Sequence, residues 1–160
     1  MLIQTLIFSL AFVVKVTLSD ACPLGWVDGE LYGVGCLFVD HEVSRSWEET
    51  AIFCQQEKNA TLLELQDYEQ LRFMTGMLNH IDGINSRSYK YWTAGTDLAR
   101  EGRWIWQGSL TPVPSEIWHA QFPMYGITHN CMELVPVYNF SFDMMDEVCL
   151  EKKFTICQKK

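Results

Sequence analysis

The first half of the chain carries apolar residues at helical spacing behind helix-starting signals. Ser46 stands three residues before Glu49, which is the spacing of a capping box at a helix N-terminus. Trp47, Ala51 and Cys54 follow at intervals of four and three residues, and residues so spaced share one face of a helix. We therefore predict a helix that buries a tryptophan together with a cysteine.

A second segment further along the chain repeats this pattern. Asp67 and Gln70 have the same three-residue spacing as the first pair. The apolar positions behind them continue the helical period as far as Gly83, at Leu71, Met74, Leu78 and Ile81. We predict a second helix that ends at Gly83.

The second half of the chain changes to short apolar segments separated by turn residues, a pattern typical of strands. These segments are YWTAGT from Tyr91, GRWIWQGS from Gly102, CMELVPVY from Cys131 and KFTICQ from Lys153. Helices followed by strands predict an α+β domain in which the helices pack on antiparallel sheet. Since the 160 residues contain no repeat or linker, we expect one such domain.

The amino-terminal segment differs from the rest of the chain. Met1 to Val14 is almost uninterruptedly apolar, but it is shorter than the about 20 residues that span a membrane. We therefore predict a secretory signal peptide over residues 1–21, with an uncleaved anchor as the weaker alternative. Cleavage after Ser19 and cleavage after Ala21 both fit the small-residue rule, and the mature domain is expected to cover residues 22–158.

Charge and motifs exclude several classes of function. The formal net charge of -8 would repel nucleic acid and other polyanions at long range. The sequence has no GxSxG motif, metal-ligand cluster or glycine-rich phosphate loop, so we do not expect an enzyme. We expect a secreted, extracellular binding protein with no nucleic-acid partner and no transmembrane span.

The cysteines support the same compartment. The six cysteines lie in the predicted mature part, and an even number in an oxidising compartment predicts three disulfides. The sequence contains neither a CxxC pair nor an HExxH motif, so we do not expect a zinc site. Spacing alone does not select one pairing among the alternatives.

Several segments together resemble a C-type lectin-like domain across residues 22–158. They are CPLGWV, SWEETAIFC, YWTAGTD, GRWIWQGS, CMEL, DEVC and KFTICQ, in that order, and WTAGTDLAREG is similar to secreted invertebrate lectin-like proteins. The resemblance implies two helices packed on antiparallel sheets, with a long loop region. It also implies the three disulfides of the long form of the domain, which are Cys22 to Cys36, Cys54 to Cys157, and Cys131 to Cys149. In this fold the positions of Trp92, Trp104, Trp106 and Trp118 are core positions, which is favoured over stacking on sugar rings.

The resemblance further implies sugar binding through calcium, for which the ligand residues can be compared. The family's main site places oxygen-bearing side chains on both sides of a cis-proline, before the next cysteine, and in a WND triplet. Here the proline is Pro123, and its neighbours Phe122 and Met124 carry no side-chain oxygen. The triplet is Met144, Met145 and Asp146, so only Asp146 keeps its ligand type. Because calcium takes six to eight oxygen ligands, we expect this site to be absent unless an insertion lets Gln121 substitute.

A second, structural calcium site of some relatives has a partial match. Asp97 and Glu101 fit an aspartate and a glutamate four residues apart, and Asn130 could add an amide oxygen. This resemblance leaves a weak structural calcium ion as one reading. The alternative is that the two carboxylates cap turns or pair with Arg100 or Arg103 on the surface.

The segment around Pro123 is the candidate ligand loop, made of Gln121, Phe122, Pro123, Met124 and Tyr125. Its apolar residues and Ile127 form either an exposed patch for a protein contact or a loop folded back on the domain. The resemblance allows a homodimer through this loop. Asn59 and Asn139 begin glycosylation sequons.

We therefore predict a secreted recognition protein of innate-immune type. It would bind protein, lipid or glycan through the apolar loop without the usual calcium site. The alternative is a calcium-dependent carbohydrate-binding lectin with a divergent loop.

Overall fold

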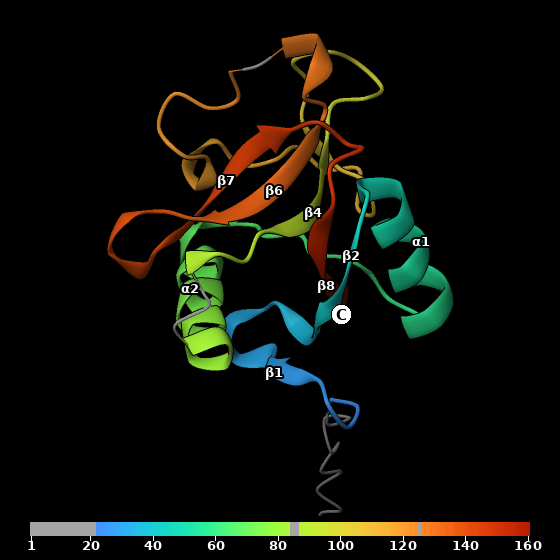
Figure 1. The fold of residues 1–160 in the computed structure, drawn as a ribbon, viewed down its shortest axis with the longest axis vertical. Coiled ribbons are helices and arrows are strands. Elements are labelled where there is room, and N and C mark those ends of the chain that lie inside the picture. Colours follow the sequence, from blue (N-terminus) through green and yellow to red (C-terminus); the bar gives the residue numbers. More distant parts are fainter. Residues whose placement is uncertain (1–21, 84–86, 125) are drawn as a thin grey trace, which may run out of the picture.

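The computed structural model describes residues 22–83, 87–124 and 126–160. The predicted signal peptide and Tyr125 of the candidate loop lie outside these residues. Two helices stand on either side of a mixed sheet, and the long segment between β4 and β6 gathers at the end of the molecule farthest from β1 (Figure 1). The strands are β1 Val27–Gly29, β2 Gly35–Arg45, β3 Thr61–Leu62, β4 Tyr91–Thr96, β5 Ile105–Trp106, β6 Cys131–Pro136, β7 Phe142–Glu147 and β8 Lys153–Lys159.

Helix α1, Trp47–Lys58, begins at the predicted capping box. The Ser46 hydroxyl accepts a hydrogen bond from the Glu49 amide, and the Glu49 carboxylate accepts one from the Ser46 amide. Trp47 and Cys54 are both buried, as the spacing predicted. The indole of Trp47 also donates to the Thr93 carbonyl at 2.8 Å, which fixes α1 against β4.

Helix α2, Tyr68–Asp82, is capped by Asp67, whose side chain accepts the Gln70 amide, and it ends at Gly83 as predicted. Its buried face includes Leu71, Met74 and Leu78. Ile81 is exposed, and Asp82 occupies the buried position in the last turn instead. Burial of this carboxylate is tolerated because the Tyr91 hydroxyl donates to it.

The six strands of the main path are ordered β1-β2-β8-β4-β6-β7, while β3 pairs with β8 and β5 with β4. Among the described strands, the pairings are antiparallel except that of β4 with β8, which run parallel. Two strands, β1 and β2, precede α1, so the expected order of helices first and strands second is wrong. The second half of β2 is polar, so a pattern of apolar segments does not reveal it; Asp40 and Arg45 are held there by pairing with β8.

The core lies between the helices and the central strands. Tyr91 and Trp92 of β4, Trp106 of β5 and Leu37 of β2 are fully buried. Three disulfides join distant segments, and they are the pairs that the resemblance implied: Cys22–Cys36, Cys54–Cys157 and Cys131–Cys149. Within the described residues, no helix is both long enough and apolar enough to cross a membrane.

Candidate functional site

The candidate loop comes shortly after Trp118 and His119, which run beside β7. The amide of His119 donates to the Met144 carbonyl at 2.9 Å, and the Phe122 amide donates to the His119 carbonyl at 3.0 Å. The Phe122–Pro123 peptide bond is cis, and Gln121 is exposed with a positive φ of 76°. Backbone hydrogen bonds therefore anchor the start of the loop, from His119 to Phe122, to the edge strand β7.

The apolar side chains of the loop divide between the two predicted arrangements. Phe122 is half-buried, with its ring centroid 5.7 Å from that of His119. Met124 is 47% exposed and Ile127 is 78% exposed. The loop thus folds back at Phe122 and presents aliphatic side chains to solvent at Met124 and Ile127.

Asp146, the one retained member of the main calcium motif, is buried in β7 and holds the loop backbone. Both of its carboxylate oxygens lie 3.2 Å from the Met124 amide nitrogen, which donates to them. A buried carboxylate needs such donors because removing it from water is costly. Asp146 therefore tethers the loop to β7 through the Met124 amide.

The surroundings of Asp146 do not supply the donor set of a calcium ion. Phe122 and Met124 contribute no side-chain oxygen, and Met145 replaces an expected amide. His129 accepts or donates at Nδ1 with the Thr128 hydroxyl, 2.8 Å away, and its Nε2 lies 3.7 Å from Glu147. Calcium requires a shell of hard oxygen ligands, so these residues do not fit the main site.

The second calcium position is only partly assembled. Asp97 is buried and Oδ2 accepts the Gly102 amide at 2.8 Å, so this carboxylate caps a turn. Its Oδ1 is buried without a hydrogen-bond partner among the described residues. Asn130 lies next to Asp97, but its amide nitrogen donates to the Ile127 carbonyl at 3.0 Å, and Glu101 is exposed.

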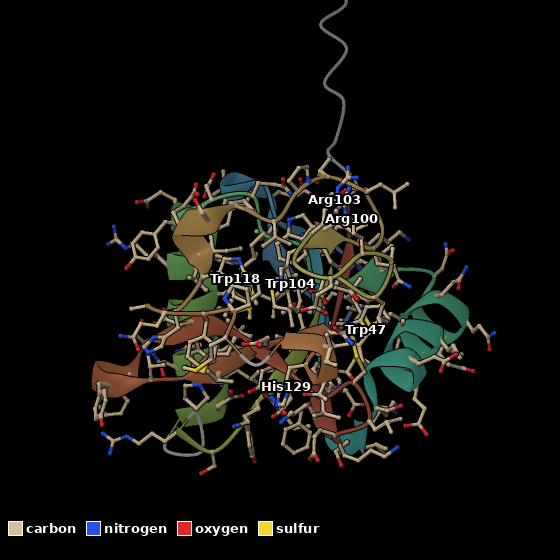
Figure 2. The ribbon with its side chains drawn as sticks, turned by 90° about the horizontal axis from the view of Figure 1, so that it is seen from above. Trp47, Arg100, Arg103, Trp104, Trp118 and His129 are labelled. Atoms are coloured by element: carbon tan, nitrogen blue, oxygen red, sulfur yellow. A yellow bond between two sulfur atoms is a disulfide. The ribbon has the colours of Figure 1, made fainter. Side chains whose placement is uncertain are left out.

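The described residues contain no group of three or more His, Cys, Asp or Glu side chains that could hold a metal ion. The fold brings Asp97 and Asn130 together, whereas Glu101 stays on the surface. Arg100 and Arg103 follow on the same exposed turn (Figure 2). The turn-capping alternative describes Asp97 directly, since the Arg100 amide also donates to its carbonyl.

The tryptophans behave mainly as core residues. Trp92 and Trp106 are fully buried. Trp104 and Trp118 are half-buried and lie side by side, with ring centroids 4.9 Å apart and planes at 78° (Figure 2). This edge-to-face pair packs against the core.

Sequence reasoning missed a buried ionic cluster in the sheet. Lys153 of β8 is 8% exposed, and its Nζ lies 2.9 Å from carboxylate oxygens of both Glu133 and Glu147. Burial alone would lower the pKa of Lys153, but hydrogen bonds with Glu147 and Glu133 outweigh it and raise that pKa. For Glu147 the effects are reversed. Burial alone would raise its pKa, but Lys153 and the Val148 amide together lower that pKa below its ordinary value. No local pattern signals this cluster, because its members come from three different strands.

A second buried polar cluster joins β2, α2 and β4. The Tyr91 hydroxyl donates to Asp82 at 2.5 Å, and His41 Nε2 lies 2.7 Å from that hydroxyl and 3.0 Å from Asp82. Burial raises the pKa of Asp82 despite the opposing effects of Tyr91 and His41. Burial and the Asp82 carboxylate also raise the pKa of Tyr91. The cluster fastens the end of α2 to the sheet.

The two sequons lie on different elements. Asn59 is the exposed C-cap of α1, in a left-handed conformation with φ of 49°. Asn139 lies in the short 3-10 helix η5, Tyr138–Phe140, between β6 and β7.

Known proteins share both the sequence pattern and the fold. Residues 43–159 match the family described as Lectin C-type domain. Natural killer cells antigen CD94 of Canis lupus familiaris is 26% identical over 140 residues, which cover 88% of this chain and 66% of that protein. The chain thus spans just under two thirds of the length of CD94. Salivary C-type lectin 1 of Aedes albopictus is 26% identical over 161 aligned residues, which cover 96% of this chain and 99% of that protein.

The solved structure of a calcium-independent type II antifreeze protein has the same fold, with a TM-score of 0.68. It is 21% identical in sequence, and the likeness covers 87% of this chain and 94% of that chain. The family match extends over most of the chain, and its helices, sheet and three disulfides agree with it. This chain belongs to the Lectin C-type domain family and is a C-type lectin-like binding protein.

Proposed function

We propose that this protein is a secreted recognition protein that binds its ligand through the candidate loop without calcium. The observation that carries the proposal is the state of Asp146, which bonds the Met124 amide with both oxygens. Met124 and Ile127 are exposed to solvent. Binding would then rest on apolar contact, with a protein, lipid or glycan as the ligand.

Extracellular location is the second part of the proposal. Three disulfides favour an oxidising compartment, and the mosquito relative is a salivary protein by its name. Residues 1–21 would act as the signal peptide, with cleavage after Ser19 or Ala21. Amino-terminal sequencing of the protein secreted by cultured cells would distinguish the two points, and its native mass would show whether it forms a homodimer.

A calcium titration tests the central claim. We expect no saturable heat in calorimetry and no rise in melting temperature when calcium replaces a chelator, because a specific ligand stabilises the folded state by mass action. On an array of glycans, any bound protein should be retained equally in calcium and in chelator. Retention that needs calcium, together with a calcium-induced rise in melting temperature, would overturn the proposal.

Loop variants test which surface binds. Met124→Glu with Ile127→Glu should abolish any retention, because the charges would have to be buried at the contact. Leu31→Glu is the matched control, since Leu31 is an exposed aliphatic residue on η1, Glu30–Tyr32, which directly follows β1 in the chain. Strand β1 lies at the end of the molecule opposite the segment between β4 and β6 (Figure 1). Equal loss in the control would place the binding surface elsewhere.

One observation favours the weak structural calcium ion. The Asp97 Oδ1 atom is buried without a partner among the described residues, and such an atom is costly unless something satisfies it. If calcium raises the melting temperature, Asp97→Asn should remove that rise while Asp146→Asn should not. This result would place an ion at the second calcium position.

A further inference from the structure

A cavity of about 580 Å³ opens beside the β6–β7 hairpin. Arg87, His119, Pro136, Val137, Tyr138, Phe140 and Met145 line it. Its volume falls within the roughly 300 to 1,000 Å³ that is typical of small-molecule sites. None of its lining residues belongs to the calcium positions of the family except Met145, which supplies no oxygen.

The lining is apolar on most sides. Pro136, Val137, Phe140 and Met145 supply aliphatic, aromatic and thioether surface, and no carboxylate is found among the described residues that line the cavity. Tyr138 is 92% exposed and Phe140 is half exposed, so the hairpin presents two aromatic rings at the surface. Such a surface favours an apolar ligand over a sugar, which would need several polar side chains to bond its hydroxyl groups.

The charge in the cavity is positive. The guanidinium of Arg87 lies over the Phe140 ring at 4.0 Å, and it forms no ion pair within the described part of the chain. His119 differs, because its Nδ1 is 2.7 Å from Asp143 and so already has a carboxylate partner. Arg87 is therefore the group that can receive an anion, and the ring beneath it holds the guanidinium in place.

We propose that this cavity binds a single-chain amphiphilic anion, such as an alkyl carboxylate. The headgroup pairs with Arg87, and the alkyl chain lies against Val137, Phe140 and Met145. The overall charge of -8 disfavours a polyanion, whereas a monoanion is held by the local cation at short range. The cavity lining includes neither Met124 nor Ile127, so variants at those two residues and at Arg87 let the two proposals fail independently.

Calorimetry with monomeric decanoate tests the proposal on the full mature protein. We expect saturable binding of decanoate, weaker binding of 1-decanol and none of decyltrimethylammonium. Arg87→Gln should weaken decanoate binding by about ten-fold and leave decanol unchanged, since a charge-assisted hydrogen bond is lost. Arg100→Gln is the matched control, because Arg100 is an exposed arginine on the turn after β4. Its substitution removes the same charge from a different place.

A second variant and a vesicle assay complete the test. Val137→Trp should fill the cavity and weaken both decanoate and decanol, which separates the cavity from a surface effect of charge. Vesicles of phosphatidylglycerol should not sediment the protein, because the site takes one chain and not a lipid surface. Absence of decanoate binding, equal weakening by Arg87→Gln and Arg100→Gln, or binding to vesicles alone would overturn the proposal.

Discussion

Lys153 shows how a single residue can depend on partners that are remote in sequence. Its ammonium group is buried between Glu133, which is 4% exposed, and Glu147. Charges removed from water are tolerated only when they are paired in good geometry. Lys153 also lies near the Trp92 ring, at 5.7 Å, so the cluster adjoins the central core. Removing this ammonium group would take away the closest cation of both carboxylates and leave Lys90, 3.4 Å from Glu133, as their nearest lysine.

Lys153→Met should therefore lower the free energy of unfolding by about 3 to 5 kcal/mol, as expected for breaking a buried ion pair. Lys152→Met is the control, because Lys152 pairs with Glu49 on the surface and such pairs contribute about 0 to 1 kcal/mol. Urea unfolding at neutral pH measures both. Equal losses in the two variants would show that the cluster contributes no more than a surface pair.

The pH dependence of the same cluster has a definite sign. The pKa of Glu147 is lowered, so its stabilisation is present above its ordinary value of 4.5 and is lost as pH falls through the lowered pKa. The pKa of Lys153 is raised, so its stabilisation is present below its ordinary value of 10.5 and is lost as pH rises through the raised pKa. The destabilisation by Lys153→Met should accordingly shrink when unfolding is measured in acid.

At the scale of elements, local signals predicted what local chemistry determines. The Ser46 capping box and the Asp67 cap begin α1 and α2, and Gly83 ends α2. The carboxamide of Gln70 bonds the Gln66 amide, one residue before Asp67, so the second capping box is altered. Strands β4, β6 and β8 coincide with apolar segments of the sequence.

Strand β7 was not predicted, because a buried acidic residue interrupts its alternation. Phe142, Met144 and Asp146 face the buried side, while the residues between them are half-buried. Asp146 is accommodated there by the Met124 amide, a contact from the loop that no local pattern can reveal. The motif alone therefore indicated that Asp146 is a metal ligand, whereas its hydrogen bonds in the fold make it a tether of the loop.

Asp146→Ala should loosen the loop as an element. Losing a hydrogen bond to a charged group costs about 1.5 to 3 kcal/mol, so the Met124 amide should exchange with solvent at least about ten-fold faster. Hydrogen exchange followed by mass spectrometry measures this on the peptide from Phe122 to Thr128. Asp28→Ala is the control, since Asp28 is exposed on β1 and bonds only a local amide. Unchanged loop exchange in Asp146→Ala would refute the tether.

The whole molecule is held by contacts between distant parts of the chain. Strand β8 lies between β2 and β4, and β4 in turn lies between β8 and β6. The disulfide pairing followed from the resemblance, and spacing alone would not have selected it. The cavity beside the hairpin could not be predicted either, because Arg87, His119 and Met145 come from three separate segments.

The two disulfides of most different span give a test at this scale. Cys54–Cys157 joins α1 to β8 across 103 residues, whereas Cys22–Cys36 closes only 14. In the chain-entropy model the longer loop should stabilise more by about 1.8 kcal/mol, since the cost of closure grows with the logarithm of loop length. The double variant Cys54→Ala with Cys157→Ala should therefore lose more unfolding free energy than Cys22→Ala with Cys36→Ala, as measured by urea unfolding. Because Cys54 and Cys157 are also fully buried, lost packing adds to the difference in the same direction. An equal or smaller loss for the long bridge would mean that the sheet and α1 already confine the unfolded chain, and that the bridge constrains little.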